Sequence, residues 1–127
     1  MERPSRPVLI IEDDSDSRLL MLTLLRLEGY SVVGASNGRE GLAVTRSERP
    51  CLIVLDLMMP VMDGVEFRAE QVRDPDIQHI PVIVVSARHD ARAAARSLGV
   101  AACVCKPIDL DELTDTVART CPAPGAC

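Results

Sequence analysis

The sequence predicts an α/β domain in which helices cover a parallel sheet. Short β-rich runs alternate with longer helical patterns five times from residue 8 onward, as expected when a crossover helix follows each strand. Two of these runs are almost uninterrupted apolar, which is typical of central strands buried on both faces. The chain of 127 residues has the length of one compact domain, and we expect a single domain over 1–127 with its core at about 7–120.

The predicted strands differ in polarity, and this indicates their places in the sheet. The third and fourth, "CLIVLD" and "PVIVVS", are the most apolar and are expected at its centre. The second, "SVVGA", is shorter and more polar and suits an edge. The predicted strands span 8–12, 31–35, 51–56, 81–86 and 102–106.

The predicted helices follow from leucine spacing and capping residues. In the first helix, Leu19, Leu22 and Leu25 recur among polar residues, and Ser15 is the predicted N-cap. Gly29 is expected to end this helix, and Asp109 is expected to cap the last one. The predicted helices span 15–28, 38–48, 64–73, 88–98 and 109–120, with short tails at 1–6 and 121–127.

The composition excludes several classes of function. The formal net charge is -5 and basic residues form no cluster, whereas nucleic-acid binding needs a basic patch, so we expect no direct contact with nucleic acid. No apolar run approaches the roughly 20 residues that cross a bilayer, and the amino terminus lacks the apolar segment of a signal peptide. We therefore expect a cytoplasmic protein that does not bind a membrane.

The five cysteines are odd in number and include no CxxC pair, so reduced thiols are expected in place of a disulfide framework or a zinc site. Cys103 and Cys105, in "ACVCKP", share one face of the last strand and are predicted to pack as small apolar residues. With one Tyr, one Phe and no Trp, the chain offers few rings for stacking on a base or a flavin.

Unusual polar residues stand where the predicted strands end. Ligands bind at the carboxyl edge of an open parallel sheet, so these groups are candidates for a site. For the acidic run after the first strand, a solvated turn or helix cap is the competing interpretation. Asp56 is harder to explain in that way, because it begins a loop. The groups are Glu12, Asp13 and Asp14 after the first strand, Asp56 after the third, Ser86 after the fourth and Lys106 after the fifth.

These residue types predict phosphoryl chemistry. If the first and third strands are neighbours, Glu12, Asp13 and Asp56 converge, and their charges repel unless a cation lies between them. Oxygen ligands alone favour Mg²⁺, which takes one or two carboxylates and a phosphate oxygen. Asp56 is then the best nucleophile, Lys106 a counter-charge for a phosphoryl oxygen, and Ser86 a further hydrogen-bond donor.

Four motifs in order, "IIEDD", "LIVLDLMMPVMDG", "VIVVSA" and "CKP", resemble the receiver domain of two-component response regulators over about residues 7–120. The resemblance implies a flavodoxin-like doubly wound (βα)5 fold, in which the strand order of the five-stranded parallel sheet is 2-1-3-4-5. It also implies phosphorelay signalling, in which a sensor histidine kinase or phosphotransfer protein donates a phosphoryl group from a phosphohistidine. Such a domain modifies only itself and is not a turnover enzyme.

The resemblance also implies individual roles. Asp56 corresponds to the phosphoacceptor, Glu12 and Asp13 to the acidic metal pair, and Met58 to the residue whose backbone carbonyl binds Mg²⁺. Ser86 corresponds to the switch hydroxyl, and Lys106 to the phosphate-binding lysine before a cis peptide bond to Pro107. Pro60 and the Asp63-Gly64 pair fit the loop after the phosphoacceptor. Asp14 is interpreted as flanking this site.

The chain departs from the family pattern on the expected output face, formed by the fourth helix, fifth strand and fifth helix. Cys103 stands where the family usually has an aromatic residue, so the aromatic switch is in doubt, and Ala101-Ala102 replaces a common acidic pair. Arg88, Arg92 and Arg96 form a basic stripe on the fourth helix, either as a solvated face or as a docking stripe for an acidic partner. A downstream partner, or a second copy of the chain, is expected to bind this output face.

Met58 and Arg88 would also border the path of the attacking water, so an altered phosphoryl lifetime is predicted. Three other functions stay open on the sequence. An aspartyl-nucleophile phosphatase would usually have a second acid two residues after its nucleophile, where this chain has Met58. A pseudo-receiver would bind partners without phosphorylation, and a flavodoxin-like protein would bind a cofactor.

Overall fold

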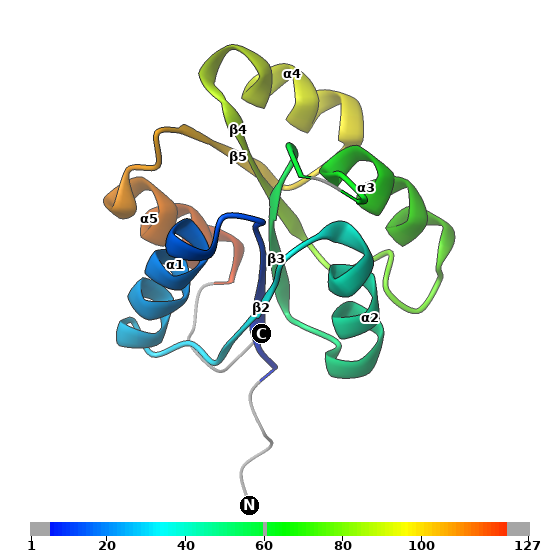
Figure 1. Ribbon diagram of the computed structural model, residues 1–127, viewed down its shortest axis with the longest axis horizontal. Helices are drawn as coiled ribbons and strands as arrows, with labels where there is room; N and C mark the ends of the chain where they lie inside the picture. Colours follow the sequence, from blue (N-terminus) through cyan, green and yellow to red (C-terminus); the bar gives the residue numbers. More distant parts are fainter. Residues whose placement is uncertain (1–5, 60, 122–127) are drawn as a thin grey trace, which may run out of the picture.

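The computed structural model describes residues 6–59 and 61–121, apart from the side chains of residues 88–90. Pro60 and the predicted tails at 1–5 and 122–127 lie outside the described residues. Strands and helices alternate along the chain as predicted (Figure 1). The strands are β1 (Val8–Ile11), β2 (Val32–Ala35), β3 (Leu52–Asp56), β4 (Val82–Ala87) and β5 (Ala102–Lys106). The helices are α1 (Ser15–Leu27), α2 (Gly38–Glu48), α3 (Gly64–Arg73), α4 (Arg88–Leu98) and α5 (Leu110–Thr120).

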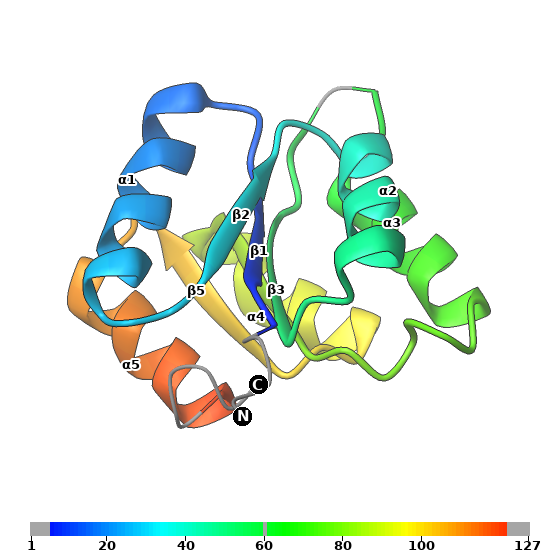
Figure 2. The same cartoon turned by 90° about the horizontal axis from the view of Figure 1, so that it is seen from below.

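All the strands pair in parallel, and the sheet order β2-β1-β3-β4-β5 confirms the expected topology. The first and third strands are therefore neighbours, with Ile11 of β1 opposite Leu55 of β3. The more polar β2 lies at one edge, as predicted, and β5 lies at the other (Figure 2). The chain reverses its direction of winding between β1 and β3, which is the switch point where such sheets bind ligands.

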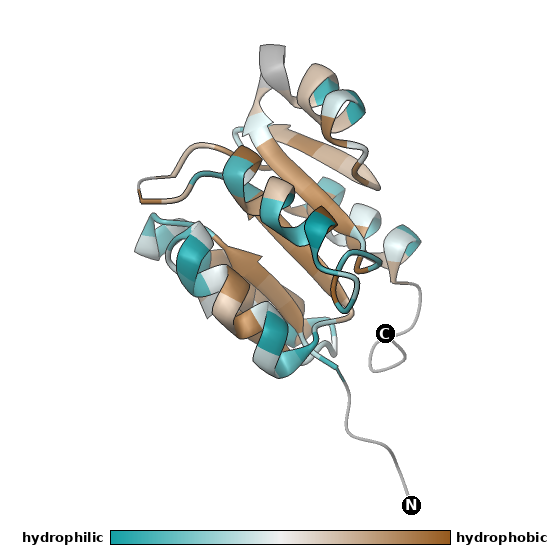
Figure 3. Ribbon diagram, turned by 90° about the vertical axis from the view of Figure 1, so that its right-hand side faces the viewer, coloured by the Kyte–Doolittle hydropathy of each residue, from teal (hydrophilic) through white to brown (hydrophobic). Residues whose placement is uncertain are grey.

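The sheet separates two apolar clusters, because successive side chains of a strand project to opposite faces. Val8 and Ile10 of β1 pack in the cluster that includes Leu25 of α1 and Val117 of α5. Leu9 of β1 packs in the other cluster with the residues of α2 and α3. The strands are hydrophobic along nearly their whole length, whereas hydrophilic and hydrophobic residues alternate along the helices (Figure 3). The central position predicted for β3 and β4 is confirmed.

Two local predictions between β1 and α1 are wrong. β1 ends at Ile11, one residue before the predicted end, and the N-cap is Asp14, whereas Ser15 is the first helical residue. The Asp14 carboxylate accepts a hydrogen bond of 2.8 Å from the backbone N–H of Ser17. This contact lowers the pKa of Asp14. An aspartate one position before a serine is an equally good cap, so residue type alone does not fix the register.

The other cap predictions are confirmed, whereas the prediction for the cysteines is only partly correct. Asp109 caps α5 and Gly29 takes a left-handed φ of 98° after α1, as predicted. Cys51, Cys103 and Cys105 are free thiols, but Cys121 is disulfide-bonded, so the expectation of reduced thiols is wrong at that position. No helix in the described part of the chain is long and apolar enough to cross a membrane.

Candidate phosphoryl site

The carboxyl ends of three strands bring the predicted site residues together. Glu12 directly follows β1, Asp56 is the last residue of β3, and Lys106 is the last residue of β5. Because these strands run in parallel, their ends meet at one edge of the sheet. The pairing of β1 with β3, on which the predicted convergence depended, is thus present.

Three carboxylates form an acidic cluster at this edge. One ligand oxygen from each of Glu12, Asp13 and Asp56 lies within 4.8 Å of the others. Glu12 and Asp56 are buried, at 1% and 2% exposure, whereas Asp13 is exposed. The Glu12 Oε1 atom is buried and accepts no hydrogen bond from the described residues. A buried oxygen without a donor is costly, and a hard cation would remove that cost.

Lys106 supplies the positive charge of the site. Its Nζ lies 3.0 Å from Asp56 Oδ2 and 3.7 Å from Glu12 Oε1. Burial on its own lowers the pKa of Lys106, but the hydrogen bond and the charges of the carboxylates outweigh burial, and the pKa is raised. The ammonium group is therefore fully charged at neutral pH, beside the carboxylate predicted to react.

The charge of Glu12 depends on its surroundings. Burial, followed by the neighbouring Asp56, raises the pKa of Glu12 to about 8. The carboxyl group thus holds a proton at neutral pH unless a cation replaces it. The carboxyl group is held through Oε2, which accepts from the Asp14 N–H at 3.2 Å. The backbone of Glu12 is held through its carbonyl, which accepts from Arg18 Nη1 at 2.7 Å. The sequence contains no signal that places Arg18 of α1 in this role.

The loop after β3 holds the Asp56 carboxylate from its other side. The backbone N–H of Met58 donates to Asp56 Oδ1 at 3.1 Å. The loop then closes on Gly64, where a Cβ atom would lie only 2.7 Å from the Cα of Leu57. Asp63 caps α3 through reciprocal bonds with Glu66. The Asp63-Gly64 pair is thus required by a helix cap and by a close backbone approach.

Ser86 lies beside the acidic cluster but does not touch it among the contacts described. It is 2% exposed, in β4, and pairs in register with Cys105. Ser86 contributes to the wall of a cavity of about 390 Å³, together with Leu57, Met58 and Asp63, and with the small α4 residues Ala93, Ala94 and Ser97. Lys106 lines a second, smaller cavity of about 260 Å³ between α1 and the start of α5. Sequence reasoning did not find either cavity.

The remaining predictions at the site have mixed outcomes. The peptide bond between Lys106 and Pro107 is cis, as the resemblance implied. Asp14 flanks the cluster, and its carboxylate caps α1. Cys103 and Cys105 are half-buried in β5, and the Arg88 side chain lies outside the described residues.

Comparison with known proteins agrees with the fold. The sequence model of the protein family described as the response regulator receiver domain matches residues 8–118 of this chain. The chain belongs to the response regulator receiver domain family. Its flavodoxin-like sheet and its acidic cluster are those of a domain used in two-component signalling.

Particular relatives cover nearly the whole described chain. Sporulation initiation phosphotransferase F of Bacillus subtilis is 33% identical over 116 residues, which are 91% of this chain and 93% of that protein. The probable transcriptional regulator ycf27 of Pyropia yezoensis is 36% identical over 89% of this chain but only 46% of its own length. The chain therefore spans about half the length of the ycf27 relatives that it matches.

Among solved structures, chemotaxis protein CheY4 of Vibrio cholerae has a TM-score of 0.83 and 26% sequence identity, covering 91% of this chain and 98% of that one. A response regulator receiver protein from Pseudomonas putida has a TM-score of 0.82 and 27% identity, covering 94% and 98% of the two chains. Both agree with the fold described above.

Proposed function

We propose that Asp56 accepts a phosphoryl group from a phosphohistidine of a sensor histidine kinase or phosphotransfer protein. The observation that carries this proposal is the position of the Asp56 carboxylate. It is buried at the end of β3, with the Lys106 ammonium group on one oxygen and the acidic pair beside it. A carboxylate in such a position serves as the nucleophile, and the ammonium group offsets the charge of the incoming phosphoryl oxygens.

The transfer exchanges one bond for another. An Asp56 carboxylate oxygen bonds to phosphorus, the phosphorus–nitrogen bond of the phosphohistidine breaks, and the imidazole leaves with the electron pair. Lys106, now 3.0 Å from Asp56 Oδ2, is close enough for its ammonium group to pair with a phosphoryl oxygen. The Ser86 hydroxyl, at the neighbouring strand end, is the proposed donor to a second phosphoryl oxygen.

The residues present fit Mg²⁺. Receiver domains generally bind this ion at an acidic pocket. Glu12 Oε1, which is buried and accepts no hydrogen bond from the described residues, favours a cation here. Glu12, Asp13, Asp56 and the backbone carbonyl of Met58 would hold the ion, an oxygen-only ligand set of the kind that Mg²⁺ prefers. When bound, the ion neutralises the repulsion between the carboxylates and the phosphoryl group.

The consequence of phosphorylation is proposed to reach partners through the output face, which consists of α4, β5 and α5. Ser86 is followed by Ala87 and then by α4, so a movement of the hydroxyl is passed to the helix directly. Arg92 and Arg96 are exposed on α4, and Asp111 and Asp115 are exposed on α5. We propose a downstream protein partner, or a second copy of the chain, as the ligand of this face in the cytoplasm, with no direct contact to nucleic acid.

The test is incubation with acetyl phosphate in the presence and absence of Mg²⁺, followed by intact mass spectrometry. We expect one added phosphoryl group with Mg²⁺, none without it, and none in Asp56→Asn. Asp16→Asn is the matched control, because Asp16 is an exposed carboxylate in the first turn of α1. The control should be labelled like the wild type.

Other outcomes separate the rival functions. An unmodified wild type in the presence of Mg²⁺ would contradict the phosphoacceptor proposal and favour a pseudo-receiver. Continuous turnover of a small phosphate ester would instead indicate a phosphatase, whereas a stoichiometric label that stops at one group supports self-modification without turnover.

A further inference from the structure

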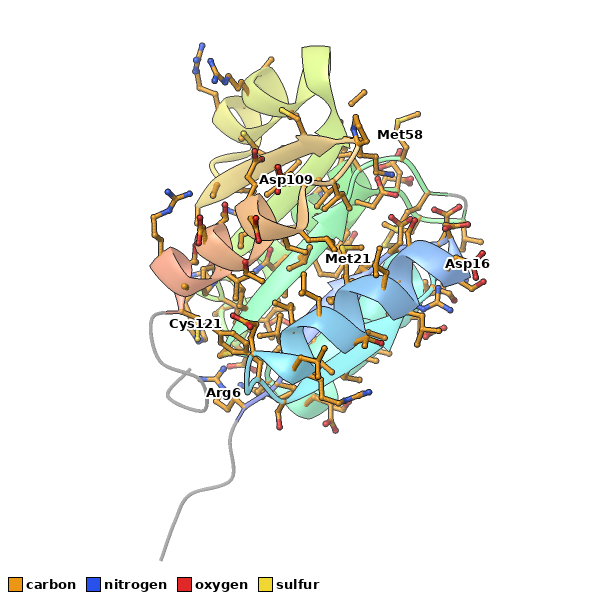
Figure 4. The ribbon with its side chains drawn as sticks, turned by 90° about the vertical axis from the view of Figure 1, so that its left-hand side faces the viewer. Arg6, Asp16, Met21, Met58, Asp109 and Cys121 are labelled. Carbon is orange, nitrogen blue, oxygen red and sulfur yellow. The ribbon has the colours of Figure 1, made fainter. Side chains whose placement is uncertain are left out.

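Two buried cysteines from distant parts of the chain meet at the end of the molecule opposite the acidic cluster. Cys51 directly precedes β3, and Cys121 follows the last residue of α5. Their Sγ atoms lie 3.8 Å apart, and their exposures are 9% and 2%. In Figure 4, Cys121 lies with Arg6 at one end of the molecule, and Met58 and Asp16 lie at the other. The cysteine pair therefore belongs to neither the phosphoryl site nor its proposed mechanism.

The two sulfurs differ in chemical state. Cys51 is a free thiol, whereas Cys121 is disulfide-bonded. With its Sγ 3.8 Å from a disulfide sulfur, the Cys51 thiol is near enough to take part in exchange, in which a thiolate attacks one sulfur and displaces the other. Burial raises the pKa of Cys51 to about 11, so the exchange is slow at neutral pH and faster in alkali.

Backbone contacts anchor the two segments that carry these cysteines. The Cys51 N–H donates to the carbonyl of Pro7 at 2.9 Å, which fastens the start of β3 to the chain before β1. The Tyr30 hydroxyl donates to the carbonyl of Cys121 at 3.1 Å, which fastens the end of α5 to the segment before β2. A disulfide has an S–S distance of about 2 Å, so bond formation requires the two Sγ atoms, now 3.8 Å apart, to approach each other.

We propose that Cys51 and Cys121 form an alternative disulfide, which ties the start of β3 to the end of α5. The Cys51 thiol gives its proton to a solvent base, and its thiolate attacks Cys121 Sγ. The existing S–S bond breaks, and the displaced sulfur leaves as a thiolate that takes up a proton. One disulfide replaces another, so no oxidant is consumed. In fully reduced protein, a low-molecular-weight disulfide supplies the oxidation and is itself reduced to two thiols.

The link would change the mechanics of the domain. It joins residues 70 positions apart, and closing a long loop restricts the unfolded chain more than closing a short one. It also fastens α5, one of the elements of the output face, to the centre of the sheet. We expect a melting temperature roughly 10 °C above that of the fully reduced protein and slower hydrogen exchange at the end of α5.

The test uses the full chain, first reduced and then equilibrated with oxidised and reduced glutathione at pH 8.5. After acid quenching and alkylation, mass spectrometry of non-reduced peptides identifies the linked pair, and calorimetry gives the melting temperature. We expect a peptide pair joined through Cys51 and Cys121, together with the rise in melting temperature. In Cys51→Ser and in Cys51→Ala the peptide pair should vanish and the rise should be smaller, because only the existing disulfide of Cys121 can then re-form. Both should persist in Cys103→Ser, which removes a half-buried free thiol of β5.

Two results would overturn the inference. One is the absence of the Cys51–Cys121 peptide pair from wild type that far-ultraviolet circular dichroism shows to be folded. The other is an equal rise in melting temperature in folded Cys51→Ala, because the stabilisation would then come from a different bond. Neither readout uses phosphorylation, so the result is independent of the function proposed for Asp56.

Discussion

Met58 lies beside the proposed phosphoryl site. The residue is 73% exposed, and its backbone N–H donates to the Asp56 carboxylate. An apolar side chain in this place offers no hydrogen bond to a water molecule that attacks the phosphoryl group. In Met58→Asn, an amide would orient that water, and one hydrogen bond of about 1 kcal/mol corresponds to roughly fivefold faster hydrolysis. Loss of radiolabelled phosphate over time measures the lifetime.

Arg88 is the second residue predicted from the sequence to affect that lifetime, so Arg88→Glu belongs to the same experiment. Met58→Leu is the matched control, since it keeps an apolar side chain of similar size and should keep the lifetime of the wild type. Equal lifetimes in the wild type, Met58→Asn and Arg88→Glu would show that neither residue affects the attacking water.

Glu12 should make the stability of the metal-free protein depend on pH. The pKa of its carboxyl group rises from an ordinary value of 4.5, taken for the unfolded chain, to about 8 in the folded protein, so the folded protein binds more protons between these values. Stability therefore falls as pH rises from about 5 to 8, by roughly 3 kcal/mol in order of magnitude. Urea denaturation in EDTA at several pH values in this window measures the slope.

The carboxyl group of Glu12 can be replaced by an amide of nearly the same shape that does not titrate. In Glu12→Gln the slope should flatten, whereas Glu48→Gln, at an exposed position near the end of α2, should retain it. Added Mg²⁺ should also flatten the slope in the wild type, because a bound cation favours the ionised carboxylate. A slope that survives in Glu12→Gln would assign the pH dependence to another group.

At the residue scale, the sequence was sufficient to predict groups whose chemistry depends on strand ends. Asp56 and Lys106 follow apolar strands directly, and parallel pairing alone brings such ends together. It was insufficient for Asp14, because an aspartate and a serine stand side by side and both are good caps. It also gave no sign of Arg18, whose bond to the Glu12 carbonyl depends on the path of the β1–α1 turn.

At the scale of the elements, Arg68 of α3 fastens the far end of α4. Its Nε donates to the carbonyl of Leu98 at 3.0 Å and its Nη2 to that of Gly99 at 3.1 Å. These are carbonyls at the carboxyl end of α4, which the helix itself leaves without donors. At the other end, Ala87 provides no side-chain cap. The helix is thus held at the end away from Ser86 and lacks a side-chain cap at the end beside it.

Removing this contact should loosen α4 where it is now held. We expect Arg68→Ala to lower the free energy of unfolding by about 2 kcal/mol, because charge-assisted hydrogen bonds to the helix end are lost. Hydrogen exchange should accelerate in the last turn of α4. Arg73→Ala on the same helix removes only an exposed pair with Glu70 and should change stability by less than about 0.5 kcal/mol. Equal losses in the two variants would refute the role of Arg68.

The elements themselves were largely predictable, because alternation and apolar runs reflect burial. β3 and β4 are buried at nearly every position, and their sequences are apolar throughout. The boundaries were less certain, as the early end of β1 at Ile11 shows, because Glu12 is almost completely buried and its N–H still donates to the Ala35 carbonyl of β2 at 3.0 Å. The contact of Arg68 with the end of α4 joins helices that are separate in the chain, and no local pattern encodes it.

At the scale of the whole molecule, negative charge is concentrated at one edge of the sheet. The chain carries a formal net charge of -5, and three of its carboxylates crowd within 4.8 Å of one another at one edge of the sheet. Lys106 offsets part of that repulsion. A divalent cation that binds only the folded arrangement would relieve the rest, and any such ligand stabilises the whole fold by mass action.

Magnesium should therefore raise the melting temperature in the absence of any phosphodonor. At a hundredfold excess over the dissociation constant, the stabilisation is about 2.7 kcal/mol, which corresponds to roughly 10 °C for a domain of this size. Calorimetry with MgCl₂, compared with NaCl at equal ionic strength, measures the specific part. Asp13→Asn should lose most of the shift, and Asp16→Asn, an exposed carboxylate in the first turn of α1, should keep it. If NaCl produced the same shift, or if Asp13→Asn retained it, the stabilisation would come from general screening of charge. Lys106 and the proton on Glu12 would then be the groups that offset the repulsion between the carboxylates.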